Sequence, residues 1–244
     1  MKKSNNSLKK LEECKKTCPG PDKCPFKGVL IDEENQVAIS CSIYAGWVKQ
    51  KEIEKEIMRT IPKSFWKKTF ENFESRSSAS KRAFELAKKY TSLEKWRDGA
   101  NLALLGGYGT GKTHLAGAIA SQAIKQGNIV AFVTLTSVAV MDFSEKRTYF
   151  EKMRDVDLLI LDDISQEVEN KFILQEMFNL INYRYEAQKG IVFTSNLKTA
   201  DFKGVIGERL FDRVMERTVF VEIFDVKSIR LKKREQFTNW AKEV

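Results

Sequence analysis

A glycine-rich stretch near the middle of the chain carries residue types that bind phosphate. It consists of Gly106, Gly107, Tyr108, Gly109, Thr110, Gly111, Lys112 and Thr113, a full match to G-x-x-x-x-G-K-[S/T]. Glycines let backbone N–H groups wrap a phosphate chain, and a helix starting at Lys112 adds a favourable dipole. The Lys112 ammonium should reach the β- and γ-phosphates of a nucleotide, and the Thr113 hydroxyl should bind Mg²⁺. The stretch therefore predicts a Mg-ATP site, with His114 behind the phosphates in a role more structural than catalytic.

Two later segments end in polar residues that would complete such a site. The apolar run Leu158–Leu161 is followed by Asp162 and Asp163, as expected of a buried strand that ends in two carboxylates. Asp162 would hold Mg²⁺, directly or through water, and Asp163 would orient the attacking water. Another apolar run ends in Thr194-Ser195-Asn196. Asn196 could hydrogen-bond the γ-phosphate or the attacking water, although a turn-forming asparagine is the simpler interpretation of that residue alone.

The elements that must position these residues begin at about residue 101, where apolar runs alternate with helical patterns. Strands are expected at Leu102–Leu105, Ile129–Thr134, Leu158–Leu161, Ile191–Thr194 and Val219–Ile223. Helices are expected at Tyr44–Met58, Ser80–Tyr90, Lys112–Lys125, Ser144–Arg154, Asn170–Glu186, Gly204–Met215 and Ser228–Lys242. Near-continuous apolar strands separated by helices indicate a parallel sheet covered on both faces. The predicted fold is a three-layer α/β domain preceded by a small cysteine-bearing module.

Four cysteines lie close together near the N-terminus. They are Cys14, Cys18, Cys24 and Cys41, and none follows them. Disulfides are rare in the cytosol, so these residues are interpreted as thiolate ligands of a metal. The spacing is irregular compared with the paired C-x2-C of a zinc ribbon, and His114 is the one histidine of the chain. An all-cysteine Zn²⁺ site is favoured, with an iron–sulfur cluster or free thiols as the alternatives.

The charge of the chain is unevenly distributed. The net charge is +9, yet residues 1–100 hold 22 Lys and Arg against 14 Asp and Glu, and the remainder is nearly balanced. This asymmetry suggests an anionic partner for the N-terminal part, such as nucleic acid or an acidic protein face, or else a merely solvated basic surface. No apolar run approaches a membrane span, and no export signal precedes the module, so a cytoplasmic protein without a membrane role is expected.

Taken together, these motifs resemble a known family. Gly109–Ala116, Leu158–Asp163, Thr194–Asn196 and Gly207–Arg213 resemble the DnaC/DnaI-type bacterial helicase loaders, which are AAA+ ATPases. The segments Ile61–Phe65 and Thr69–Phe73 look like the stretch that precedes their AAA+ domain. The resemblance covers about residues 10–240 and is specific mainly from residue 61 onward. The four cysteines are similar to the cysteine-bearing N-terminal modules of some of these loaders.

The resemblance implies roles for several residues. Asn196 matches the sensor-1 position, and Arg230 matches the sensor-2 arginine that contacts nucleotide in the same subunit. Arg213 matches the arginine finger that reaches the ATP of a neighbouring subunit, with Arg209 as a competitor, so self-association is expected. Most AAA+ proteins carry Asp-Glu where this chain has two aspartates. Because Asp163 is one methylene shorter than Glu, slow hydrolysis and a nucleotide switch are expected.

Single-stranded DNA contact is expected just after the two aspartates. The matching residues are Lys171 and Phe172. A basic side chain next to an aromatic ring suits binding of the DNA backbone together with stacking on the bases. Phe172 also fits the apolar stripe of its helix, which is the alternative interpretation.

Three regions and one function are predicted on this basis. Residues 1–60 form a cysteine-bearing helicase-binding module, 61–100 a linker and lead-in helix, and 101–244 the AAA+ ATP-binding domain. The predicted function is an ATPase that binds the replicative DNA helicase and delivers it to single-stranded DNA under ATP control. An IstB-like transposition helper is the main alternative. A P-loop kinase acting on a small molecule is less favoured because the arginines cluster at 209, 213 and 217 instead of on a lid.

Overall fold

Five apolar segments form one parallel sheet in the computed structural model of the chain, which describes residues 12, 14, 16, 18, 20–32, 37–134, 137–138, 141–165 and 171–224. The strands are β3 (Asn101–Gly106), β4 (Val130–Thr134), β5 (Leu158–Ile164), β6 (Ile191–Ser195) and β7 (Thr218–Ile223). Their order across the sheet is β4-β5-β6-β3-β7, and every pairing is parallel. The predicted parallel sheet is confirmed. Because all strands point the same way, the ends of β3, β5 and β6 meet at one edge.

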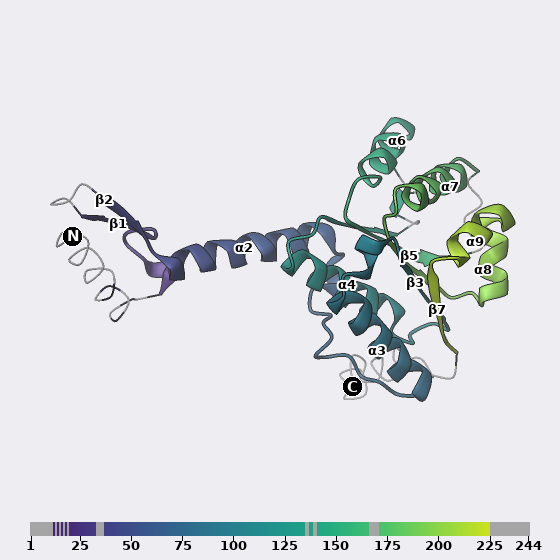
Figure 1. The fold of residues 1–244 in the computed structure, drawn as a ribbon, viewed down its shortest axis with the longest axis horizontal. Helices are drawn as coiled ribbons and strands as arrows, with labels where there is room; N and C mark the ends of the chain where they lie inside the picture. The colour runs from purple at the N-terminus through teal and green to yellow at the C-terminus, as the bar shows by residue number, and fades with distance from the viewer. Residues whose placement is uncertain are drawn as a thin grey trace, which may run out of the picture. The chain divides into compact units, whose positions relative to one another are not determined.

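Helices cover both faces of this sheet (Figure 1). One face is covered by α4 (Lys112–Lys125), which packs against β5 and β6, and by α3 (Ser78–Ser92), which packs against α4 and β7. The helices packed on the opposite face are α6 (Phe143–Lys152), α7 (Lys171–Glu186), α8 (Thr199–Ile206) and α9 (Glu208–Met215). The arrangement is therefore the three-layer α/β architecture that the alternating pattern predicts.

Alternation along the strands divides the core between the two faces. Ala103 and Leu105 of β3 pack with the helices α6 to α9, and both are fully buried. Leu102 and Leu104 point to the other face because successive side chains of a strand alternate, and they too are buried. This two-sided burial explains why β3 and β5 are continuous apolar runs instead of alternating ones.

Residues 57–100 belong to the same compact unit as the sheet. The segment after α2 (Ser42–Thr60) crosses α4, where the Phe65 ring stacks on Phe132 of β4 at 6.4 Å between centroids. The helix α3 then starts with a capping box in which the Ser77 hydroxyl accepts the Ser80 N–H. The lead-in segment is thus packed against β4 and α4.

The N-terminal residues form a second unit, Met1–Glu56. Its described part contains a short turn of helix at Pro21–Lys23 and an antiparallel hairpin of β1 (Val29–Asp32) and β2 (Val37–Ser40), followed by most of α2. The helix predicted at Tyr44–Met58 lies within α2, whereas the hairpin was not predicted.

One other expectation differs from the structure, and one lies where the structure does not test it. The helix predicted at Gly204–Met215 is two helices, α8 and α9, because Gly207 at φ 83° interrupts the helical path. The helix predicted at Ser228–Lys242 lies outside the described residues. Among the described helices, none is long and apolar enough to cross a membrane.

Candidate nucleotide-binding site

The loop after β3 requires glycine at two positions. A Cβ on Gly106 would stand 2.3 Å from the carbonyl oxygen of Ile223, so a side chain cannot fit between the neighbouring strands. Gly111 has φ 100°, and its Cβ would meet the Phe73 ring at 2.7 Å. The Thr110 hydroxyl donates to the Gly107 carbonyl at 3.0 Å and closes the loop. The result is a tight backbone turn that delivers the chain to the start of α4.

The first residues of α4 place an ammonium and a hydroxyl inside this turn. Lys112 is buried, and its Nζ donates to the carbonyl oxygens of Gly106 and Gly107 at 2.8 Å each. The Thr113 hydroxyl is hydrogen-bonded to the carboxyl group of Asp162 on β5. A cation, a hydroxyl and a carboxylate thus meet at a helix N-terminus, which is the set of groups that phosphate and Mg²⁺ require.

Asp162 and Asp163 have different surroundings despite being neighbours. Asp162 is buried, and burial raises the pKa of its carboxyl above the usual range, although hydrogen bonds from Thr194 and Thr113 act in the opposite direction. Asp163 is exposed and has the left-handed backbone conformation, with φ 59°. The buried carboxyl suits a bound cation that would hold it ionised, and the exposed one faces the solvent side of the site.

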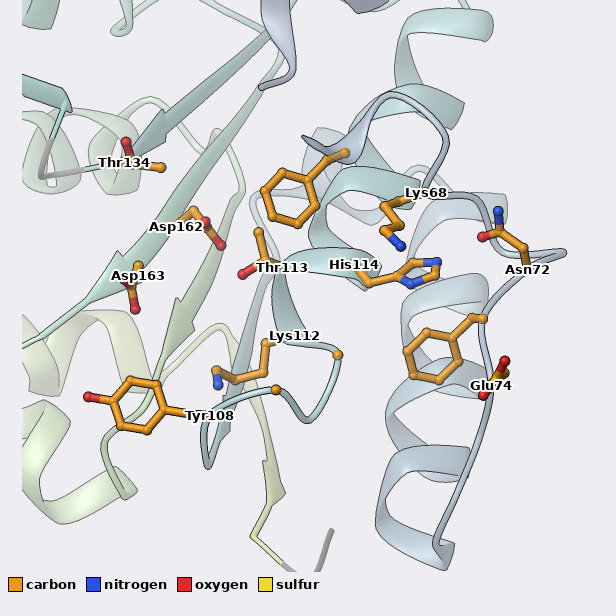
Figure 2. Close-up of a pocket in the computed structure, with 14 residues that line it drawn as sticks. Lys68, Asn72, Glu74, Tyr108, Lys112, Thr113, His114, Thr134, Asp162 and Asp163 are labelled. Carbon is orange, nitrogen blue, oxygen red and sulfur yellow. The ribbon is translucent and has the colours of Figure 1, made fainter. Parts of the chain in front are cut away.

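A cavity of about 380 Å³ lies between these groups and the lead-in segment (Figure 2). Its lining includes Lys112, Thr113, Asp162 and Asp163. The side facing them is formed by Phe65, Lys68, Asn72, Phe73 and Glu74, with Thr134 at the end of β4. None of these six residues was predicted to take part in binding. The signal that could have found them is the concentration of aromatic residues in a polar stretch directly ahead of the domain.

His114 and Tyr108 complete the surroundings of the loop. His114 lines the cavity, and its Nε2 lies 2.9 Å from the Thr69 carbonyl oxygen, while its ring meets the Phe73 ring edge-on at 5.1 Å. Tyr108 is largely exposed, and its hydroxyl accepts a hydrogen bond from the Asn196 side-chain amide. The Asn196 Oδ1 atom is buried without a hydrogen-bond partner among the described residues. The hydrogen bond between Asn196 and Tyr108 thereby connects the end of β6 to the glycine-rich loop after β3.

Other predicted residues lie away from this cavity. Arg213 is exposed on α9 and donates to Asn182 on α7, and Arg209 is exposed on the same helix. Lys171 is the first residue of α7, and the partly buried Phe172 that follows it is not among the residues that line the cavity. Arg230 lies outside the described residues.

The four cysteines surround a second, much smaller cavity. Cys14, Cys18, Cys24 and Cys41 all line a space of about 10 Å³, together with apolar residues of the hairpin. Burial raises the pKa of the Cys14 thiol, and the three other thiols raise it further. Among the described residues, no group of three or more Cys, His, Asp or Glu is arranged to hold a metal ion. Four thiols are nevertheless a donor set that suits Zn²⁺.

The fold and the loop define the class of protein. A parallel sheet with a glycine loop between its β3 strand and a helix, and with an aspartate at the end of β5, is a P-loop nucleotide-binding domain of AAA+ type. The chain belongs to the IstB-like ATP binding protein family, whose profile matches residues 47–237.

Relatives with similar sequences include replication proteins. An uncharacterized protein of Escherichia coli K12, YdaV, is 27% identical over 214 residues, which cover 84% of this chain and 86% of that protein. The replicative helicase loader DnaC of the same organism is 28% identical over 171 residues, covering 66% of this chain and 69% of the loader.

Solved structures agree on the fold. The crystal structure of the DnaC helicase loader has a TM-score of 0.60 at 22% identity and covers 66% of this chain and 99% of that one. The replication initiator DnaA bound to AMPPCP and single-stranded DNA has a TM-score of 0.57 at 26% identity and covers 71% of this chain and 56% of the initiator.

Proposed function

We propose that this chain is a helicase loader that binds Mg-ATP at the 380 Å³ cavity and delivers a replicative DNA helicase to single-stranded DNA. The observation that carries the proposal is the convergence of Lys112, Thr113 and Asp162 on one cavity, in a chain related to DnaC. The family profile is equally compatible with a transposition helper ATPase, because its name specifies ATP binding and no partner.

Each group at the cavity has a role in this proposal. Lys112 would leave its two carbonyl acceptors and pair with the β- and γ-phosphates, since a charged oxygen is the stronger acceptor. Thr113 and Asp162 would hold Mg²⁺, Asp163 would orient the attacking water, and the Asn196 amide would bind the γ-phosphate. The bound Mg²⁺ would neutralise charge that develops on the phosphates. We expect slow turnover because Asp163 has a short side chain, and rapid hydrolysis by the isolated protein would contradict this.

The partner distinguishes the loader from the transposition helper. The test is co-purification of the intact protein with a replicative helicase and, separately, with a transposase, each with and without Mg-ATP. Capture of the helicase, together with ATP hydrolysis that increases on addition of single-stranded DNA, is the expected result. Capture of the transposase alone would replace the loader with the helper function. Phe172→Ala should reduce the DNA stimulation if this residue stacks on bases.

An exposed apolar surface on the hairpin is the candidate docking site for the helicase. Val29 and Ile31 of β1 are exposed by 45% and 73%, and Phe26 in the turn just before the hairpin is exposed by 52%. Exposed apolar side chains grouped on one small element are a common feature of interaction sites. We predict that Ile31→Asp reduces helicase capture at least about tenfold, as removal of a central apolar anchor does. ATP binding should stay unchanged, because the change lies in the other unit.

The matched control for this variant is Leu93→Asp. Leu93 is exposed by 52% at the end of α3, in the unit that carries the ATP site. The Leu93→Asp variant should capture as much helicase as the unmodified protein does. Equal capture by the Ile31 and Leu93 variants would exclude the hairpin as the docking surface.

Arg213 is proposed to act on the ATP of a neighbouring subunit. It is exposed and is not among the residues that line the cavity of its own chain, as expected of a residue that acts in trans. We predict that Arg213→Ala binds ATP normally but loses about tenfold or more in turnover, because it lacks the charge that stabilises the transition state. A mixture of Arg213→Ala and Lys112→Ala should recover part of the activity, since paired subunits can form one complete site. A mixture that stays inactive would argue against a site shared by two subunits. Arg209→Ala tests whether Arg209 takes the arginine-finger role instead.

The four cysteines are proposed to hold a structural Zn²⁺ that stabilises the N-terminal unit. All four cysteines line one small cavity, and a small unit can gain stability from a bound metal. Metal analysis of freshly purified protein should give about one zinc per chain. Iron with labile sulfide would indicate a cluster, and neither metal would leave four free thiols.

A further inference from the structure

The two aspartates lie at an irregularity in the pairing of β5 with β6. Leu161 pairs with Phe193, but Ile164 pairs with Ser195, so β5 has one residue more than its partner strand. Such a bulge disrupts the ladder locally and leaves a backbone group without its usual strand partner. Asp163, with φ 59°, is the residue that absorbs the change in direction. Some other group must hold this conformation, because the left-handed region is unfavourable for a residue with a Cβ.

A single buried hydroxyl occupies the position of the missing ladder partner. Thr194 of β6 is fully buried, and its Oγ1 accepts the Asp163 backbone N–H at 2.9 Å. The same hydroxyl donates to Asp162 Oδ1 at 2.7 Å. A hydroxyl has one hydrogen to donate and lone pairs that accept, so the Thr194 hydroxyl can hold Asp162 and Asp163 at the same time. The neighbouring Ser195 hydroxyl donates to the Ile164 carbonyl and holds the far side of the bulge.

We infer that Thr194 is a positioning residue for both aspartates: its hydroxyl fixes the Asp163 backbone and the Asp162 carboxylate in the orientations that ATP hydrolysis needs. This inference rests on the proposed function, because it assigns no chemistry of its own to Thr194. Without the hydroxyl, the Asp163 N–H would have no partner, and the peptide would be free to rotate. Asp163 would then turn relative to the cavity, and Asp162 would lose one of its two hydroxyl contacts.

Two substitutions separate the hydroxyl from the shape of the side chain. Thr194→Val keeps the branched shape and removes the hydroxyl, whereas Thr194→Ser keeps the hydroxyl and removes a methyl group. For Thr194→Val we expect kcat for ATP to fall about tenfold to a hundredfold, the effect of misplacing a reacting group by roughly 1 Å. The ATP concentration at half-maximal rate should change less than about threefold, because Lys112 and the glycine loop are untouched. Thr194→Ser should keep kcat within about threefold.

A second readout does not depend on turnover. The Mg²⁺ concentration that gives half-maximal binding of a fluorescent ATP analogue should rise for Thr194→Val and stay unchanged for Thr194→Ser. If the unmodified protein hydrolyses no ATP, the hydrolytic part of the proposed function fails, and the Mg²⁺ readout still decides the role of Thr194. Equal behaviour of the two variants in both measurements would overturn the inference. So would complete loss of ATP binding by Thr194→Val, because that result would indicate a purely structural role.

Discussion

Replacing Lys112 by alanine should reduce ATP turnover by about a hundredfold or more, the usual cost of removing a charged group aimed at a reacting phosphate. Affinity for ATP should fall by about tenfold to a hundredfold, since a hydrogen bond from a charged donor contributes about 1.5–3 kcal/mol. Lys112 is buried within the loop, and its two acceptors are backbone carbonyls of that loop.

The control for this variant lies on the same helix. Lys125 is exposed in the last turn of α4, so Lys125→Ala removes one positive charge without reaching the cavity. It should bind and hydrolyse ATP within about twofold of the unmodified protein, because exposed charges contribute little. Binding is measured by titration with a fluorescent ATP analogue, and turnover by phosphate release. Full turnover by Lys112→Ala would remove the cavity from consideration as the ATP site.

The parts of this site that the sequence predicted are those with local causes. A glycine loop between a strand and a helix is encoded in eight consecutive residues, so Gly106–Thr113 could be placed without any knowledge of distant contacts. The same holds for Asp162, because an apolar run that ends in a carboxylate marks a strand end. Parallel strands then bring Thr113 and Asp162 to one edge of the sheet, which the structure confirms.

The parts that were missed depend on contacts between distant segments. Phe73 lies against Gly111 and His114, and the aromatic residues around Phe73 in the sequence do not indicate which distant residues it contacts. The bulge at Asp163 is likewise invisible in an apolar run, because it reflects the register between β5 and β6. Gly207 was included in one continuous helix although glycine is a common helix breaker, and its positive φ separates α8 from α9.

Arg184 is a further case in which the sequence carried no signal. An arginine in the last turn of a helix is normally a solvated residue that interacts with the helix dipole. Here the side chain is fully buried, and burial lowers the pKa of its guanidinium to about 10, so it remains a cation at neutral pH. It donates to five backbone carbonyl oxygens, those of Met153, Arg154, Val156, Asp157 and Gly190. One side chain thus joins α7 to the segment before β5 and to the start of β6.

Replacing Arg184 by methionine should destabilise the protein by about 3 kcal/mol or more, because each lost bond comes from a charged donor and the carbonyls stay in the interior. For a unit of this size, such a loss lowers the melting temperature by roughly 6–12 °C. Methionine keeps a similar length and flexibility, so the loss reports on the donors more than on packing. Unfolding can be followed by tryptophan fluorescence, since the buried Trp96 accepts the Gly190 N–H through its carbonyl, next to this cluster.

Two further variants test the cause of that loss. Arg147 is exposed on α6 and pairs with Glu151 at 3.6 Å, so Arg147→Met should change stability by less than about 0.5 kcal/mol. Arg184→Lys keeps the charge, but its single ammonium group cannot reach five carbonyl oxygens from one position. The stability of this variant should lie between that of Arg184→Met and that of the unmodified protein. If Arg184→Lys is as stable as the unmodified protein, charge alone is sufficient and the five-carbonyl geometry is not what holds α7 to the sheet. If Arg184→Met is also as stable as the unmodified protein, the hydrogen bonds of the cation only offset the free-energy cost of burying it.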